Sequence, residues 1–140
     1  MVSVLIIDES APARGALGGY LHSIGCRVVA ESDSTAQALE LFHATRPALV
    51  VLDIAVPRAS GLDALSLFRQ MRKEAPRMPI LVVTAAASRE VRRIFIREGA
   101  LDYLVKPLDG ASLEWMRRRL ENNFPELVAR STRPMAHAHA

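Results

Sequence analysis

The sequence is short of several features that mark particular classes of protein. It has one cysteine, Cys26, so no disulfide can form within the chain, which fits a reducing compartment. No apolar run approaches the ~20 residues that a membrane-spanning helix needs, and no basic segment with a small-residue cleavage site precedes the first apolar run. We therefore expect a cytoplasmic protein without a signal peptide or a membrane contact.

Glycine-rich phosphate loops are also absent. Residues 8–16, which follow the first apolar run, contain neither G-x-G-x-x-G nor a P-loop. Ala55 stands two residues after Asp53, where an aspartate-based phosphatase would want a second acid. These absences weigh against a nucleotide-binding protein or a small α/β phosphotransferase, which we keep as an alternative function.

Lysine is scarce, and the net charge of +3 comes from many arginines. This excess is mild and is by itself weak support for a nucleic-acid or acidic partner. Several arginines gather in the C-terminal part of the chain: Arg89, Arg92, Arg93, Arg97, Arg117, Arg118 and Arg119. Because no DNA-binding motif accompanies them, we expect an acidic protein surface as the partner rather than nucleic acid.

Short apolar runs alternate with segments of helical period. The strands are expected over residues 4–7, 28–30, 49–52, 80–83 and 103–105. Their apolar runs are continuous rather than alternating, which is typical of parallel strands that helices cover on both faces. The 140 residues therefore predict one α/β domain in which five βα units form a single doubly wound sheet.

Capping residues and glycines bound the expected helices. They lie over about residues 11–24, after Ser34, after Gly61, after Ser88 and over about residues 111–122. Phe124-Pro125 closes the last helix. We therefore assign residues 1–123 to the domain and residues 124–140 to a short flexible tail.

The residues directly after the strands carry the chemistry. The acidic pair Asp8-Glu9, Asp53, Thr84 and Lys106 each follow an apolar run. Parallel α/β sheets bind ligands at the carboxyl ends of their strands. If these strands are neighbours, three carboxylates, a hydroxyl and an ammonium meet at one edge of the sheet.

Asp8, Glu9 and Asp53 are candidate metal ligands. Three carboxylates in one pocket repel one another and raise one another's pKa. A hard cation such as Mg²⁺ removes that penalty and prefers oxygen ligands. Taken singly, each acid could instead cap a helix or face solvent, so the metal hypothesis depends on all three meeting.

Asp53 is also the candidate nucleophile, because a carboxylate can attack phosphorus and form an acyl phosphate. Thr84, a hydroxyl donor, and Lys106, a positive charge, would then hold the phosphoryl oxygens. The bond between Lys106 and Pro107 can be cis, and a cis bond in a tight turn is usually a deliberate feature.

These segments, in this order, resemble the receiver domain of bacterial response regulators, and in particular the single-domain chemotaxis regulators. The matching segments are Asp8-Glu9, residues 52–57 with Gly61, residues 83–85 and residues 103–107. No single segment is specific, but all of them in order are, and the match covers about residues 2–122. The resemblance implies a flavodoxin-like fold with a five-stranded parallel sheet in the order 2-1-3-4-5.

The resemblance also implies a metal site and a phosphorylation site. Asp53 would accept a phosphoryl group from a phosphohistidine on a histidine kinase or a phosphotransfer protein. Asp8, Glu9, Asp53 and the backbone carbonyl of Ala55 would hold Mg²⁺ or Mn²⁺. The second acid of the family is usually aspartate, so the extra methylene of Glu9 has to be accommodated.

Switching follows from the same resemblance. Lys106 and Thr84 would contact the phosphoryl oxygens, after which Thr84 moves toward the phosphoryl group and Tyr103 turns inward. The face made by the fourth helix, the fifth strand and the fifth helix would then change its partner. We therefore expect a stand-alone receiver, not an enzyme, that signals to a downstream effector protein. A degenerate receiver that binds without phosphorylation, and a homodimer, stay open as alternatives.

Overall fold

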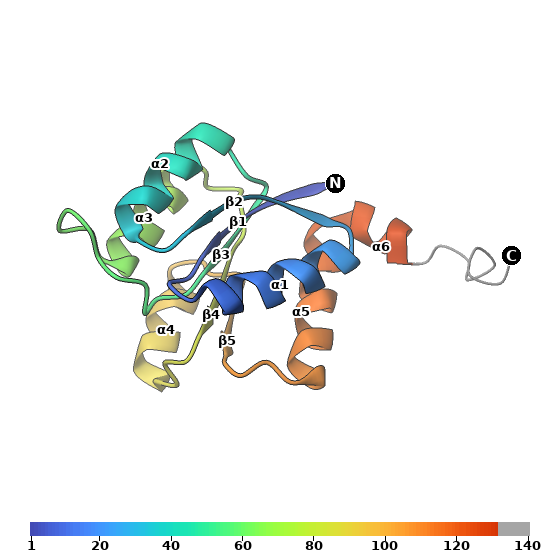
Figure 1. The fold of residues 1–140 in the computed structure, drawn as a ribbon. Coiled ribbons are helices and arrows are strands. Elements are labelled where there is room, and N and C mark those ends of the chain that lie inside the picture. The colour runs from blue at the N-terminus through green and yellow to red at the C-terminus, as the bar shows by residue number, and fades with distance from the viewer. Residues whose placement is uncertain (132–140) are drawn as a thin grey trace, which may run out of the picture.

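The computed structural model describes residues 1–131, which form five strands and six helices (Figure 1). The strands are β1 (Val2–Ile7), β2 (Cys26–Ser32), β3 (Leu49–Leu52), β4 (Ile80–Thr84) and β5 (Asp102–Val105). The helices are α1 (Ala11–Ser23), α2 (Thr35–Thr45), α3 (Ala64–Glu74), α4 (Arg89–Arg97), α5 (Gly110–Asn123) and α6 (Pro125–Ser131). Among these residues, no helix is long and apolar enough to cross a membrane.

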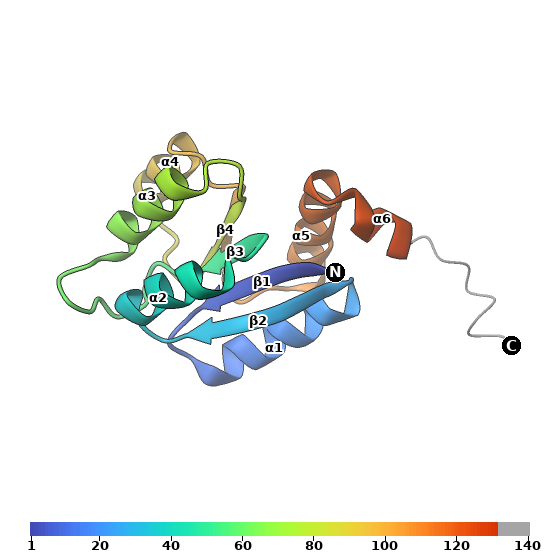
Figure 2. The same ribbon diagram turned by 90° about the horizontal axis from the view of Figure 1, so that it is seen from above.

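All five strands are parallel and lie in the order β2-β1-β3-β4-β5, which confirms the expected doubly wound sheet. Helices cover both faces of this sheet (Figure 2). One core lies under α2, α3 and α4, and its centre includes Leu5, Phe68 and Phe95. The other lies under α1, α5 and α6 and includes Leu21 and Met116. Strand residues are therefore buried on either side, which explains the continuous apolar runs.

Side chains cap the helices where the sequence indicated. Ser34 accepts a hydrogen bond from the amide of Gln37 at the start of α2, and Ser88 accepts one from Val91 at the start of α4. Each such bond satisfies a backbone donor that has no partner within the helix. The caps therefore fix where these helices begin, just beyond the carboxyl ends of the strands.

The C-terminal part of the chain differs from the expected tail. The structure forms α6 from Pro125 onward, and Leu127 is only 1% exposed in the core beside α5. Proline is tolerated in the first turn of a helix, so Pro125 ends one helix and begins the next. The rest of the expected tail, residues 132–140, lies outside the described residues.

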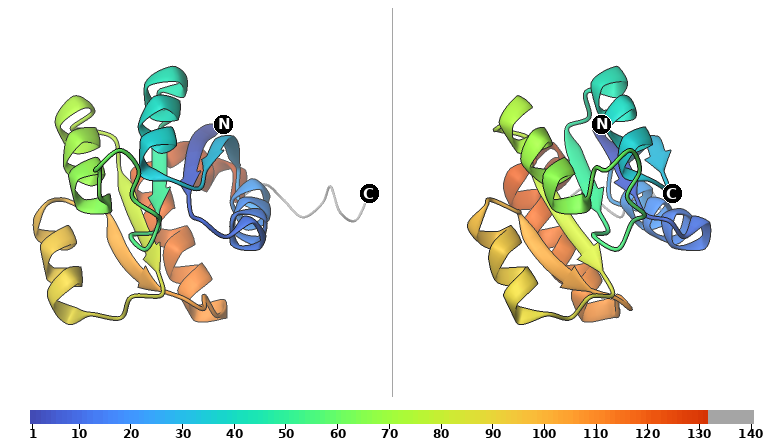
Figure 3. Two further views of the ribbon diagram at one scale, coloured as in Figure 1. Left: turned by 60° about the vertical axis from the view of Figure 1, so that its left-hand side comes forward. Right: turned by 90° about the vertical axis from the view of Figure 1, so that its left-hand side faces the viewer.

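The outer strand β5 lies between α4 and α5 (Figure 3). Arg92 of α4 donates to the carbonyl of Tyr103 in β5 at 3.0 Å, and Arg119 of α5 donates to the carbonyl of Leu101, the residue before β5, at 2.7 Å. The carboxylate of Asp102 accepts a bond from the Tyr103 amide at 2.7 Å. The amide and the carbonyl of Tyr103 are thus paired with side chains rather than left for another strand.

The burial of Leu127 predicts that α6 stabilises the domain. Leu127→Ala should lower the free energy of unfolding by about 2–5 kcal/mol, because it removes buried methyl groups and leaves a cavity. Ile94→Ala is the matched control: Ile94 is 42% exposed, and its loss should cost about 0.5 kcal/mol or less. Urea denaturation of both variants measures the difference, and equal effects would mean that α6 is not part of the core.

Candidate functional site

Asp8 and Asp53 lie next to each other at the carboxyl edge of the sheet because β1 and β3 are neighbours. The amide of Asp53 donates to the carbonyl of Ile7 at 2.8 Å, which extends the β1–β3 ladder by one residue and places both acids at the same level. Both side chains are buried, with Asp8 5% and Asp53 6% exposed. Two carboxylates buried side by side need a cation or hydrogen-bond donors.

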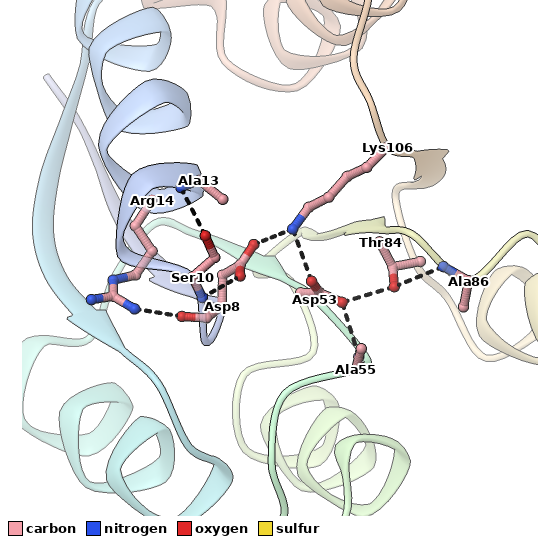
Figure 4. A network of polar contacts seen from close by, with 9 residues as sticks. All are labelled: Asp8, Ser10, Ala13, Arg14, Asp53, Ala55, Thr84, Ala86 and Lys106. Carbon is pink, nitrogen blue, oxygen red and sulfur yellow. Dashed lines mark hydrogen bonds and ion pairs between the residues drawn. The ribbon is translucent and has the colours of Figure 1, made fainter.

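Lys106 supplies the positive charge. Its Nζ donates to Oδ2 of Asp8 and, at 2.9 Å, to Oδ2 of Asp53 (Figure 4). The lysine comes from the loop after β5, and its peptide bond to Pro107 is cis. One ammonium thus joins the ends of three strands, as the sequence predicted.

The other oxygen of Asp53 is held by donors from two further segments. Oδ1 accepts from the hydroxyl of Thr84 at 2.7 Å and from the amide of Ala55 at 2.9 Å. Thr84 is fully buried, and its hydroxyl also accepts from the amide of Ala86 at 3.3 Å. Asp53 therefore has a fixed orientation, with donors at both oxygens, as a nucleophile needs.

Asp8 is held by Ser10 and Arg14, neither of which the sequence singled out. Its Oδ1 accepts from the amide of Ser10 at 2.9 Å, and its carbonyl accepts from Nη1 of Arg14 at 2.6 Å. Arg14 also pairs with Glu31 on β2 at 2.9 Å. Ser10 could have been found as the N-cap of α1, but the Arg14 contacts join segments far apart in sequence and leave no local signal.

The expected metal triad is only partly assembled. Asp8 and Asp53 both point their Oδ2 atoms at a single cation, the Lys106 ammonium, so their oxygens suit a hard cation. Glu9, however, is exposed, and in residues 1–131 no three Asp, Glu, His or Cys side chains gather as metal ligands. Consecutive residues after a strand point in different directions, so the adjacent acid does not follow Asp8 into the site.

The surroundings keep the two protonated groups near Asp53 protonated. Partial burial by itself would lower the pKa of Lys106, but its hydrogen bonds to Asp8 and Asp53 outweigh that effect and raise it. Burial, and then the negative charge of Asp53, raise the pKa of the Tyr103 hydroxyl. The lysine is thus a cation and the tyrosine a hydrogen-bond donor at neutral pH.

Tyr103 links this site to α4. Its ring is buried, 2% exposed, and its hydroxyl donates to the carbonyl of Ala86 at 2.5 Å. Its own carbonyl accepts from Arg92. Hydrogen bonds therefore run from Asp53 through Thr84 and Ala86 to Tyr103 and on to α4.

The arginines of α4 form an exposed basic surface next to β5. Arg89, Arg93 and Arg97 are exposed and, among the described residues, pair with no carboxylate within 4.0 Å. The exposed apolar residues Val105 and Trp115 lie on the neighbouring β5 and α5. This surface suits a partner that is acidic and partly apolar.

Comparison with known families places the chain among signalling domains. Residues 4–116 match the model of the response regulator receiver domain. The chain is 36% identical over 131 residues to the response regulator MprA of Mycobacterium bovis, covering 93% of this chain and 55% of the relative. It is 39% identical over 111 residues to the probable transcriptional regulator ycf27 of Guillardia theta, covering 79% and 42%. The chain thus spans about half the length of these curated relatives.

Solved structures agree in fold. The receiver domain of the response regulator AraT from Geobacillus stearothermophilus superposes with a TM-score of 0.77 at 26% identity, covering 89% of this chain and 96% of that one. A CheY-like receiver domain protein from Methanospirillum hungatei JF-1 superposes with a TM-score of 0.76 at 23% identity, covering 90% and 98%.

The position of Lys106 between two carboxylates predicts how its loss changes cation binding. Lys106→Met should fold, with a free energy of unfolding about 1–3 kcal/mol lower, because two buried carboxylates lose their shared cation. Mg²⁺ should raise its melting temperature more than that of wild type, since no ammonium competes for the oxygens. Lys73→Met, at the other lysine of the chain, which is exposed, is the control. A Mg²⁺-induced shift no larger than in wild type contradicts this assignment.

Proposed function

Because the chain belongs to the response-regulator receiver domain family, we propose that it is a phosphoacceptor: Asp53 takes a phosphoryl group from a phosphohistidine on a histidine kinase or phosphotransfer protein. The observation that carries this proposal is the setting of Asp53. It is a buried strand-end carboxylate whose two oxygens are held by Lys106 and Thr84, both of which can donate to a phosphoryl group.

In the proposed transfer, an oxygen of Asp53 attacks phosphorus, a P–O bond forms and the P–N bond to the histidine breaks. The electron pair of that bond leaves with the imidazole, and the product is an acyl phosphate. Lys106 balances charge on the phosphoryl oxygens, and Thr84 donates its hydroxyl to one of them. Water attack on the acyl phosphate would return Asp53 and free phosphate.

Mg²⁺, or Mn²⁺ in its place, would be held by Asp8, Asp53 and the carbonyl of Ala55. When bound, the cation supplies charge neutralisation between the incoming phosphoryl group and the carboxylates. The role expected for Glu9 stays a prediction, since its side chain is exposed. That exposure favours the second candidate function, a degenerate receiver that binds a partner without phosphorylation.

The proposed output is a change of partner at the surface formed by α4, β5 and α5. A phosphoryl group on Asp53 adds about two negative charges at the site and needs the Thr84 hydroxyl as a donor. Thr84 and Tyr103 both bond to the backbone of Ala86, Thr84 to its amide and Tyr103 to its carbonyl. The carbonyl of Tyr103 in turn accepts from Arg92 on α4. In this proposal the domain acts as a stand-alone receiver toward a separate acidic effector protein.

A homodimer through the same surface is less favourable on charge. In a two-fold contact the same patch of each molecule meets its copy, so the exposed arginines of α4 in one molecule would approach the basic surface of the other. Like charges across an interface cost free energy. An acidic partner avoids that cost and is therefore the partner we expect.

Phosphorylation of Asp53 is directly testable. Incubated with a small phosphodonor and Mg²⁺, wild type should gain about 80 Da by intact mass, the mass of one added phosphoryl group. Asp53→Asn should gain nothing, while Asp33→Asn, at an exposed aspartate, should gain as much as wild type. An undiminished adduct in Asp53→Asn would place the phosphoacceptor elsewhere, and no adduct in wild type would favour the degenerate receiver.

The hydrogen bonds that lead from Asp53 to α4 predict which amide resonances change when the phosphoryl mimic beryllofluoride binds at Asp53. Amide resonances of residues 89–97 and of Tyr103 should shift together with those of the Asp53 pocket, because Thr84 and Tyr103 join the two. Arg92→Ala should reduce the α4 shifts and leave the Thr84 shift intact, whereas Arg93→Ala, which loses no bond to β5, should behave as wild type. Shifts confined to the pocket in wild type would refute signalling through this surface.

A further inference from the structure

The segment from residue 54 to residue 63, between β3 and α3, is fastened to the start of α2 by Thr35. The amide of Thr35 donates to the carbonyl of Pro57 at 3.2 Å, and its hydroxyl makes two further bonds within the segment. Thr35 is fully buried. It opens α2, one residue after the N-cap Ser34, whose side chain accepts from the Gln37 amide.

Residues 59–62 form a tight turn around this hydroxyl. Ala59 and Leu62 pair in antiparallel fashion, and the Leu62 amide donates to the Ala59 carbonyl at 3.1 Å. The central residues Ser60 and Gly61 have φ of 56° and 73°, the two positive values of a type I′ turn.

The Thr35 hydroxyl stands between the two groups that would otherwise form the second hydrogen bond of this turn, the Ala59 amide and the Leu62 carbonyl. In a closed two-residue hairpin, the Ala59 amide would donate straight to the Leu62 carbonyl. Here the Ala59 amide donates to Oγ1 of Thr35 at 2.9 Å, and Oγ1 donates to the Leu62 carbonyl at 2.6 Å. A side chain 24 positions before Ala59 is thus an integral part of the turn.

The other end of the same segment carries groups of the phosphorylation site. The amide of Ala55 donates to Oδ1 of Asp53 at 2.9 Å, and the amide of Val56 donates to the Asp53 carbonyl at 3.2 Å. Pro57 is the next residue, and its carbonyl is held by Thr35. Ala55, whose carbonyl is the expected metal ligand, therefore lies between fixed points at Asp53 and at Pro57.

We propose that Thr35 is a positioning residue for cation binding: its hydroxyl and amide hold the segment that presents the Ala55 carbonyl beside Asp53. This inference rests on the proposed function, in which that carbonyl and the two aspartates hold Mg²⁺. Groups that orient the metal ligands without binding the metal themselves commonly affect metal affinity strongly. Thr35 acts through the loop and touches neither the cation nor the phosphoryl group.

The hydroxyl, rather than the bulk of the side chain, carries this role. Valine fills the same space as threonine but leaves the Ala59 amide and the Leu62 carbonyl without their shared partner. Left unpaired, these groups cost free energy and loosen the turn, and closing on each other they shift it. Of the bonds that hold the segment to residue 35, Thr35→Val keeps the one from the backbone amide to the Pro57 carbonyl. Serine keeps the hydroxyl and both bonds.

The test compares Thr35→Val, Thr35→Ser and Thr45→Val in the full chain without phosphodonor. Thr45 lies on the same helix and also spends its hydroxyl on a backbone carbonyl, that of Leu41 at 2.7 Å, far from the loop. Melting temperature is measured across a Mg²⁺ titration. The Mg²⁺ concentration at half of the maximal shift should rise about tenfold in Thr35→Val and stay at the wild-type value in Thr35→Ser and Thr45→Val.

A second variant and a second readout cover the case in which Thr35→Val is too unstable to titrate. Gly61→Ala strains the positive φ of the turn, with no atom near the added methyl group, and should raise the half-maximal Mg²⁺ concentration in the same direction. Amide hydrogen exchange at Ala59 should quicken in Thr35→Val and not in Thr35→Ser.

The outcomes separate the two proposals. A wild type that responds to Mg²⁺ and accepts a phosphoryl group, with an unchanged Mg²⁺ midpoint in Thr35→Val and Gly61→Ala, overturns the role of Thr35 alone. A lower melting temperature of Thr35→Val with an unchanged half-maximal Mg²⁺ concentration also overturns it, because Thr35 would then stabilise the fold without affecting cation binding. A wild type that shows neither Mg²⁺ response nor phosphorylation removes the proposed function itself.

Discussion

The site depends on one constraint: two carboxylates, Asp8 and Asp53, are buried at the ends of adjacent strands and have to share a cation. Burying such charges is costly unless they are paired and hydrogen-bonded. Lys106 meets that need from the end of β5, and Thr84 and Ala55 supply donors to the remaining oxygen of Asp53. The relative positions of β1, β3, β4 and β5 are thus tied to one electrostatic balance, and a phosphoryl group or a divalent cation would alter that balance directly.

The sheet and most of the site could be predicted from the sequence because their signals are local. A continuous apolar run that stops at a polar residue marks both a buried parallel strand and the group at its carboxyl end, as at Leu52 and Asp53. The helix α6 was missed because Phe124-Pro125 resembles a terminator, and a single buried leucine in a short segment gives no periodic signal.

Contacts made between distant segments could not be predicted in the same way. Thr35 meets the turn at residues 59–62 only once β1, β2 and β3 are in place, and Arg92 meets Tyr103 only when α4 packs beside β5. The acidic pair was predicted as a unit, yet only Asp8 enters the site, because side-chain direction after a strand depends on the turn that follows. Composition tells which groups are available, and the packed fold decides which of them meet.

The bonds of the Arg92 and Asp102 side chains to the backbone of Tyr103 in β5 have a consequence for assembly. A strand at the end of a sheet invites another strand to pair with it, which is a common origin of aggregation. Here side chains already occupy the amide and the carbonyl of Tyr103 in the middle of that edge, which hinders a strand of a second molecule from pairing there. An edge protected in this way lets the surface around it change what it binds while each molecule keeps its own sheet.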